Sequence, residues 1–155
     1  MSTPPVVANK LSVHKFGGTS LGSAQRFAAV ADLLLEMHSE QAGPPVVVVS
    51  AMSGSTSQLI AGARAAAEWA DQAQSARYWQ VKASLLERHL QVVSELLQHP
   101  AERLQVSGWV EDRLHDLERL YRSIAVLGEV TARGLDAVSS FGELLSSHIL
   151  AAALR

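Results

Sequence analysis

The chain has 155 residues, of which 48% are hydrophobic, and its formal net charge is -2 at pH 7. This length allows one domain with a real core, and the interspersed charges lack the basic patch of a nucleic-acid-binding protein, so we expect no nucleic-acid partner. Cysteine is absent, which excludes disulfides, thiolate catalysis and zinc–cysteine sites. The first residues lack a secretion-signal pattern and no apolar run approaches the about 20 residues of a membrane span, so we expect a cytoplasmic protein without a membrane segment.

Two short apolar runs predict two parallel strands joined by a helix in a right-handed βαβ unit. After residues 1–10, which we expect to form a flexible lead-in, residues 11–16 predict a buried strand that ends at two glycines. Residues 46–49, Val-Val-Val-Val, are typical of a strand covered on both faces in a parallel sheet. Between them, a helix is predicted from the N-cap Ser23 to the Gly-Pro-Pro at residues 43–45. Its apolar residues recur at helical spacing: Phe27, Val30, Ala31, Leu34 and Met37.

The turn after the first strand has the composition of an anion-binding loop. Gly17 and Gly18 let an anion approach the backbone closely, and the helix that follows directs N–H groups and the positive end of its dipole toward the same place. Lys15 adds a mobile positive charge that could stabilise a phosphoryl group. This lysine precedes the glycines, so the segment is not a Walker A loop. A bare pair of glycines could also serve backbone shape alone.

A second polar loop is expected beside this turn, because the carboxyl ends of parallel strands lie at the same edge of a sheet. The second strand runs into residues 50–57, Ser-Ala-Met-Ser-Gly-Ser-Thr-Ser. A helix that begins near Thr56 or Ser57 would point its N-terminus into the same crevice and favour a carboxylate or phosphate there. Taken singly, such hydroxyls are more often helix caps and turn formers than ligand-binding groups.

The middle of the chain predicts a helical hairpin over about residues 75–126. Apolar residues follow alternating steps of four and three on both sides of a break at Pro100, so two helices can pair antiparallel through apolar seams. A stripe of this kind is usually core, and an association surface is the alternative. The first seam comprises Trp79, Ala83, Leu86, Leu90, Val93 and Leu97, and the second comprises Val110, Leu114, Leu117, Tyr121 and Ile124.

A final helix is predicted from near Glu129 to the end of the chain, with a break at Phe141-Gly142. Glu143 would then lie at a helix start, where an acidic residue usually serves only as a partner for the helix dipole. The six histidines share no spacing on one face and have no accompanying carboxylates, so we assign no metal ligand. His14 alternates to the face opposite Lys15, which favours a packing role.

Three segments resemble aspartokinases, in the amino acid kinase family. Residues 15–20, Lys-Phe-Gly-Gly-Thr-Ser, are similar to the opening motif of that family, and the Val-Val-Val-Ser-Ala segment that ends at Ala51 is similar to its second strand and loop. Residues 140–146, Ser-Phe-Gly-Glu-Leu-Leu-Ser, are similar to its Gly-Glu-Leu segment. The resemblance implies an α/β fold, an amino acid kinase-like three-layer sandwich with a parallel-rich sheet. Within the family, residues 53–60 and His14 are more similar to the bifunctional aspartokinase–homoserine dehydrogenases.

Two features favour an amino-terminal fragment of the kinase domain over residues 11–155. Two parallel strands alone do not make a covered sheet, and the final predicted helix runs to Arg155 without a glycine stop. The Gly-Arg-Gly-Gly-Ser-Asp-type motif that the family carries downstream is absent from this sequence. The resemblance therefore implies that the chain alone would be inactive.

The resemblance also implies an activity, with ATP and Mg²⁺ as cofactors. It is phosphorylation of the side-chain carboxylate of L-aspartate to 4-phospho-L-aspartate, the first step of lysine, threonine and methionine biosynthesis, by an enzyme expected to be a homo-oligomer at full length. Lys15 would be catalytic; the phosphate- and ATP-binding residues would be Lys15, Gly17, Gly18, Thr19 and Ser20, and the substrate-binding residues Ser50, Thr56 and Glu143. Two alternatives stay open: a kinase for glutamate, carbamate or N-acetylglutamate, and a noncatalytic helical association module.

Overall fold

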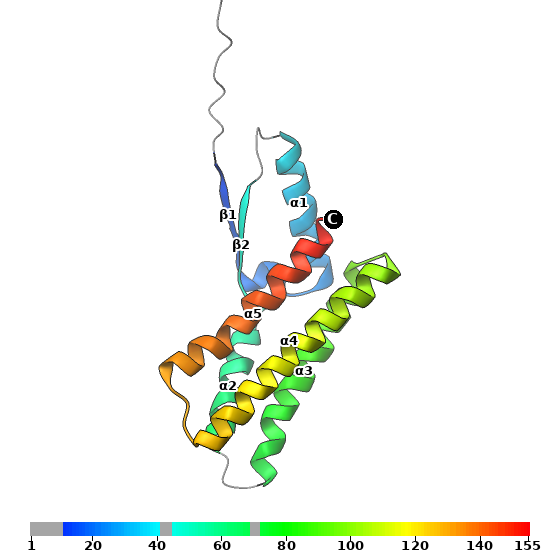
Figure 1. Ribbon diagram of the computed structural model, residues 1–155. Helices are drawn as coiled ribbons and strands as arrows, with labels where there is room; N and C mark the ends of the chain where they lie inside the picture. Colours follow the sequence, from blue (N-terminus) through cyan, green and yellow to red (C-terminus); the bar gives the residue numbers. More distant parts are fainter. Residues whose placement is uncertain (1–10, 41–44, 69–71) are drawn as a thin grey trace, which may run out of the picture.

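The apolar runs at residues 11–16 and 46–49 form two paired strands in the computed structural model, which describes residues 11–40, 45–68 and 72–155 (Figure 1). The predicted lead-in and the glycine and proline at residues 43–44 lie outside the described residues. The elements are β1 (Val13–Phe16), a 3-10 turn η1 (Gly18–Leu21), α1 (Ala24–Glu40), β2 (Val46–Val49), α2 (Ser55–Ala67), α3 (Gln72–Leu96), α4 (Pro100–Leu127) and α5 (Ala132–Ala153).

The sheet is parallel, as predicted, but the described residues cover only one of its faces. The strands pair in register from Val13 with Val46 to Phe16 with Val49. Phe16, Val47 and Val49 pack against the core, whereas Val13 and Val46 point outward and are 62% and 44% exposed. The prediction of strands covered on both faces is therefore not met here. This part of the chain is mostly helical with a two-stranded sheet, and it does not show the three-layer sandwich.

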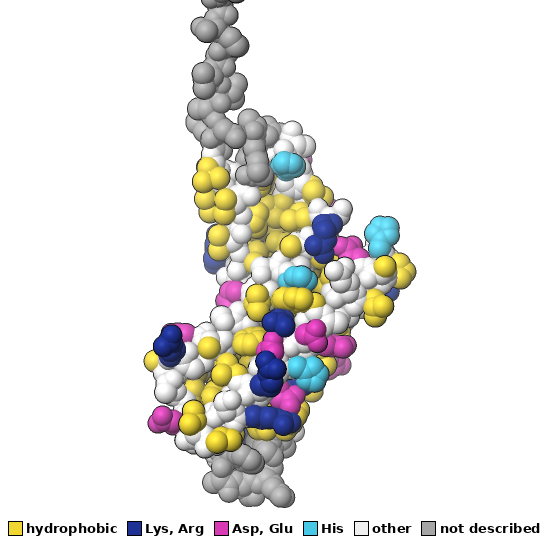
Figure 2. Space-filling view, viewed as in Figure 1, with side chains coloured by type: hydrophobic (Ala, Val, Ile, Leu, Met, Phe, Trp, Pro, Cys, Tyr) yellow, Lys and Arg dark blue, Asp and Glu magenta, His cyan; other side chains and the backbone are white. Residues whose placement is uncertain are grey.

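The first helix forms where its apolar spacing predicted. The carbonyl of Ser23 accepts the hydrogen bond of the Phe27 N–H at 3.0 Å, which begins α1 at the next residue. The predicted apolar face is buried, apart from a half-buried Met37. Figure 2 shows hydrophobic side chains at the surface over the strands and α1, and intermixed basic and acidic side chains over the helical part. No helix in the described ranges combines the length and the apolar content that crossing a membrane requires.

Helices α3 and α4 lie side by side and form the helical part with α2 and α5 (Figure 1). All five predicted seam residues of α4 are buried. On α3 the predicted seam is partly wrong, because Tyr78 is buried while Trp79 is 38% exposed and Ala83 is also exposed. Two cations, Lys82 and Arg122, lie over the ring of Trp79 at this surface, at 5.5 and 5.2 Å from the centroid.

The apolar seam of the hairpin packs against other parts of the same chain. Leu117 is fully buried and Leu86 packs against the core, so neither is available as the association surface that the noncatalytic alternative requires. Helix α2 packs closely on α4, where the Tyr121 hydroxyl donates a hydrogen bond to the Leu59 carbonyl at 2.8 Å. A Cβ on Gly62 would lie 2.5 Å from that hydroxyl, so only glycine fits there.

The predicted break at Phe141-Gly142 is wrong, because α5 continues through it without interruption. The helix instead begins at a capped end, where the Thr131 side chain accepts a hydrogen bond from the Gly134 N–H at 3.1 Å. Gly142 is buried and faces Ala51. Its lack of a side chain serves a close approach between α5 and the loop after β2, and not a helix end.

Candidate functional site

The first loop of the candidate site follows β1. Lys15 lies at the carboxyl end of this strand with an exposed side chain, and its Nζ is 3.8 Å from the point that a Cβ on Gly17 would occupy. The ammonium therefore lies over the glycine turn. A Cβ on Gly18 would be 2.7 Å from the Ala51 carbonyl oxygen, so glycine is required where the two loops meet. Within the turn, the Ser20 N–H donates to the Gly17 carbonyl at 2.9 Å.

The second loop follows β2 and is hydrogen-bonded directly to the first. The Ser50 N–H donates to the Phe16 carbonyl at 3.0 Å, and the Ser53 N–H donates to the Gly18 carbonyl at 3.1 Å. Gly54 then takes a left-handed conformation, with φ of 82°, and α2 begins at Ser55, just before the start predicted near Thr56 or Ser57. The polar loops thus lie side by side, as the strand topology predicted.

Glu143 reaches the second loop from the middle of α5. Its Oε1 accepts a hydrogen bond from the Ala51 N–H at 3.3 Å, and the side chain is otherwise exposed. A Cβ on Gly142 would lie 2.5 Å from the Cβ of Ala51, which shows how closely α5 approaches this loop. Glu143 is not at a helix start, so its interpretation as a partner of the helix dipole is wrong.

The two loops that carry the predicted site residues meet at the carboxyl edge of the strands, and α5 reaches them through Glu143. Gly18 and Glu143 both contact Ala51, and Lys15 lies near Gly17 in the first loop. Such a set can bind a small molecule that carries both an anionic group and an ammonium group. The first loop contributes Lys15, Gly17, Gly18, Thr19 and Ser20; the second loop and the first turn of α2 contribute Ser50 and Thr56; and α5 contributes Glu143.

One cation at these loops is not suggested by the sequence pattern. Arg88, on α3, donates from Nη1 to the Ser53 carbonyl at 2.6 Å and from Nη2 to the Gly22 carbonyl at 3.3 Å. The sequence hints at Arg88 only as one of the charged residues that interrupt the apolar stripe between Leu85 and Val92. That signal does not say which loops the arginine reaches, because they lie far away in the sequence.

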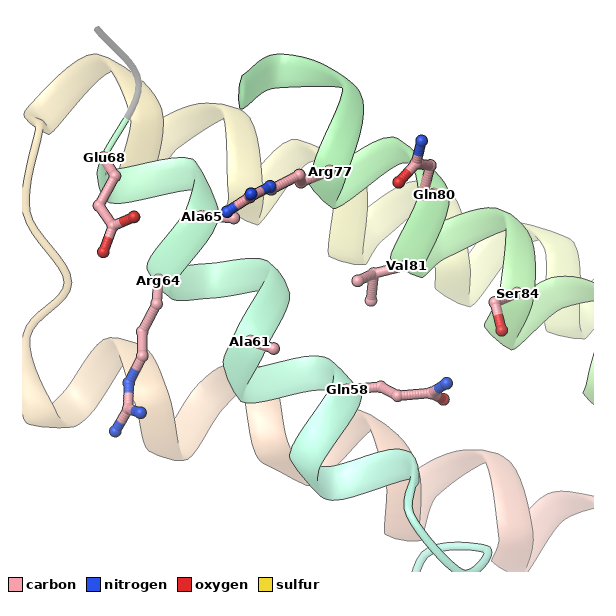
Figure 3. Close-up of a pocket in the computed structure, with 9 residues that line it drawn as sticks. All are labelled: Gln58, Ala61, Arg64, Ala65, Glu68, Arg77, Gln80, Val81 and Ser84. Atoms are coloured by element: carbon pink, nitrogen blue, oxygen red, sulfur yellow. The ribbon is translucent and has the colours of Figure 1, made fainter. Parts of the chain in front are cut away.

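A cavity of about 570 Å³ lies away from these loops, between α2 and α3 (Figure 3). Arg77 points from α3 toward Ala65, and Gln58 extends from α2 toward α3, whereas Arg64 points away from α3. The cavity contains none of the predicted site residues. We place the candidate site at the loops because glycine backbone, cation and carboxylate meet there.

The residues present fit a phosphate group better than a metal ion. Lys15 over the glycine turn offers a cation and a closely approachable backbone, which is what a phosphate of ATP needs. Among the described residues, no group of three His, Asp or Glu side chains could hold a metal ion. No Mg²⁺ ligand is therefore assigned within the ranges that the structure describes.

Comparisons of the sequence with known proteins all point to one family. The sequence profile of the amino acid kinase family matches residues 10–155. Chloroplastic aspartokinase 1 of Arabidopsis thaliana is 38% identical over 143 residues, which cover 92% of this chain and 23% of that protein. Chloroplastic bifunctional aspartokinase/homoserine dehydrogenase 2 of the same plant is 31% identical over 144 residues, which cover 93% of this chain and 15% of that protein.

Solved structures agree on the fold. The structure of Escherichia coli aspartokinase III in complex with aspartate and ADP matches with a TM-score of 0.75 at 23% identity, over 94% of this chain and 29% of that one. This chain spans less than a quarter of the length of the two plant relatives named above. Both of those relatives are named as chloroplastic, so the cytoplasmic location stays a prediction for this chain.

Proposed function

Because this chain belongs to the amino acid kinase family, we propose that it supplies the aspartate-binding and phosphoryl-stabilising part of an ATP-dependent aspartate kinase. The observation that carries the proposal is the double role of Ala51. Its N–H binds the carboxylate of Glu143, and its carbonyl lies against Gly18 of the turn beneath Lys15. A ligand seated at Ala51 therefore meets groups for an ammonium and for a phosphate at the same time.

In the proposed reaction, a side-chain carboxylate oxygen of aspartate attacks the γ-phosphoryl group of ATP, and ADP leaves. Lys15 stabilises the negative charge of the transferring group, and Gly17, Gly18, Thr19 and Ser20 cradle it. Glu143 faces the ammonium of aspartate, while Ser50 and Thr56 orient its carboxylates. Catalysis of this kind consists mainly of alignment and charge stabilisation, and ATP supplies the phosphoryl group.

Mg²⁺ and the rest of the nucleotide site are not assigned to this chain. The described residues do not bring together a set of metal ligands, so no step is routed through the ion. We accordingly expect no turnover from the 155-residue chain alone. Formation of aspartyl phosphate by this chain, trapped with hydroxylamine, would contradict that expectation.

The proposal is tested by Lys15→Ala in the full-length gene product. We expect turnover to fall by on the order of a hundredfold or more, because one preorganised cation is lost from the transferring group, while thermal unfolding changes little. Arg133→Ala is the matched control: it removes one exposed positive charge from α5, outside the site, and should change turnover by less than about twofold. Near-normal turnover in Lys15→Ala would refute the role of Lys15.

The substrate is tested separately by competition. L-aspartate should be phosphorylated in preference to glutamate, carbamate and N-acetylglutamate when the acids are supplied together. Preference for one of the other acids would retain the kinase fold and reject the aspartate assignment. The homo-oligomer proposed for the full-length enzyme is checked by light scattering in the same preparation.

A further inference from the structure

Arg88 connects the helical hairpin to both loops of the candidate site. Its guanidinium donates to the carbonyl of Ser53 in the second loop and to that of Gly22, at the end of the first loop. The side chain is half-buried and lies beside His89, which is fully buried in the core. The arginine therefore stands on a helix that packs into the core, while its own bond to the Ser53 carbonyl lies at the surface.

The contacts of Arg88 complete a closed set of hydrogen bonds around the 3-10 turn. The start of the turn is held directly, since the Ser53 N–H donates to the Gly18 carbonyl at 3.1 Å. The end of the turn is held through Arg88, which joins the Gly22 carbonyl to the carbonyl of the same Ser53. Arg26 also donates to the Thr19 carbonyl within the turn at 2.7 Å, but that bond joins the turn to α1. Arg88 therefore adds a second attachment between the turn and the second loop, beside the bond from Ser53 to Gly18.

From this geometry we infer that Arg88 is a positioning residue, which holds the glycine turn and the second loop in the relative orientation that binds ligand. The planar guanidinium suits this task because it presents two N–H directions to two carbonyls at once. A lysine at the same position would bring a point charge that cannot span both in the same way. The inference deepens the proposed function and rests on it only for the identity of the ligand.

The chain contains a closely matched control. Arg103, on α4, is also half-buried and also donates to two backbone carbonyls, those of Leu97 at 3.1 Å and Gln98 at 3.5 Å. These carbonyls belong to the turn between α3 and α4, which contributes no residue to the candidate site. Arg103→Gln therefore removes the same chemistry without touching the two loops.

Amide hydrogen exchange by NMR on the 155-residue chain tests the inference without requiring turnover. In Arg88→Gln we expect exchange at the Ser20 and Ser53 amides to accelerate by about tenfold or more, with amides in α4 unchanged. Arg103→Gln should leave both loop amides within about twofold of the unaltered chain. Arg88→Lys should restore little of the protection.

Three results would overturn the inference: unchanged loop amides in Arg88→Gln, uniform acceleration across the whole chain, or full protection in Arg88→Lys. Titration with L-aspartate, followed at the Ala51 amide, adds the functional link. Its dissociation constant should rise by about tenfold in Arg88→Gln and stay within about twofold in Arg103→Gln. Failure of the unaltered chain to bind aspartate would count against the proposed function, and the exchange data would still decide the role of Arg88.

Discussion

Gly142 of α5 and Ala51 of the second loop touch so closely that a methyl group on residue 142 would lie 2.5 Å from the Ala51 side chain. This contact brings Glu143 within hydrogen-bonding distance of the Ala51 N–H. Ala51 in turn lies against Gly18. The packing of one helix against one loop thus sets the position of a proposed ligand-binding carboxylate.

Gly142→Ala should therefore destabilise the chain, although alanine is the better helix former. We expect a loss of about 1–3 kcal/mol in the free energy of unfolding, because the helix and the loop must move apart. Gly108→Ala is the control, since a Cβ at that position on α4 meets nothing within 4 Å. It should stabilise the chain by about 0.5–1 kcal/mol, as measured by urea denaturation. Equal effects of the two substitutions would contradict this account of Gly142.

A buried ion cluster between α3 and α4 should contribute more stability than a more exposed one on α4. Glu118 is 9% exposed, and its carboxylate binds Lys82 from α3 and Arg122 at 2.8 Å. Glu118→Gln should cost about 1–3 kcal/mol at pH 7, because two cations lose a charged acceptor. The control Asp116→Asn breaks pairs with Arg113 and with an Arg119 that is 80% exposed, and should cost less than about 1 kcal/mol.

The cost of Glu118→Gln should also depend on pH. Burial alone would raise the pKa of Glu118, but the hydrogen bond and charge of Lys82, with the charges of Arg122 and His115, bring that pKa below its usual value. The stabilisation is thus present above the unfolded-state pKa of about 4.3 and is lost as pH falls through the lower folded-state value. Denaturation curves of the two proteins should converge in acid. A difference that stays constant down to pH 3 would exclude this assignment.

We expect His89 to make the free energy of unfolding depend on pH as well, in a higher pH range than Glu118. Burial lowers its pKa, the charge of Arg88 lowers it further, and the hydrogen bond between Nδ1 and the Leu85 carbonyl opposes both. Because the unfolded chain takes up this proton first, the free energy of unfolding should fall as pH decreases below about 6.5, by at most about 1.4 kcal/mol per pH unit.

His89→Gln should flatten that dependence between pH 7 and 5, whatever its effect at pH 7. Burial and the charge of Arg155 also lower the pKa of His148, so this histidine contributes a slope of the same sign, which remains in the variant. His148→Gln therefore serves as the comparison. Parallel curves for the unaltered chain and His89→Gln would show that His89 does not titrate in this range.

Local patterns predicted the parts of the fold that depend on neighbouring residues. The spacing from Phe27 to Leu34 identified the buried face of α1, and the seam from Val110 to Ile124 identified that of α4. The order of strand, helix and strand brought the Lys15 turn beside Ser50, because parallel strands end at one edge.

Long-range contacts account for what the sequence could not predict. Gly142 resembles a helix break until Ala51 is known to lie against it. Trp79 resembles a core residue until Arg122 of α4 is found over its ring. Arg88 resembles a solvent-facing residue until its two carbonyl partners are known. In each case the decisive neighbour is set by tertiary packing and not by local spacing.

Because Arg88 stands on α3, we expect the packing of that helix to affect the ligand affinity proposed for the loops. The same helix buries Leu85, one turn before the arginine, in the core. We expect a smaller side chain at that position to shift the guanidinium of Arg88 as well as to loosen the core. Substitutions in the core of the helical bundle should therefore change the affinity of the loops for the proposed ligand, although the substituted side chains do not contact that ligand.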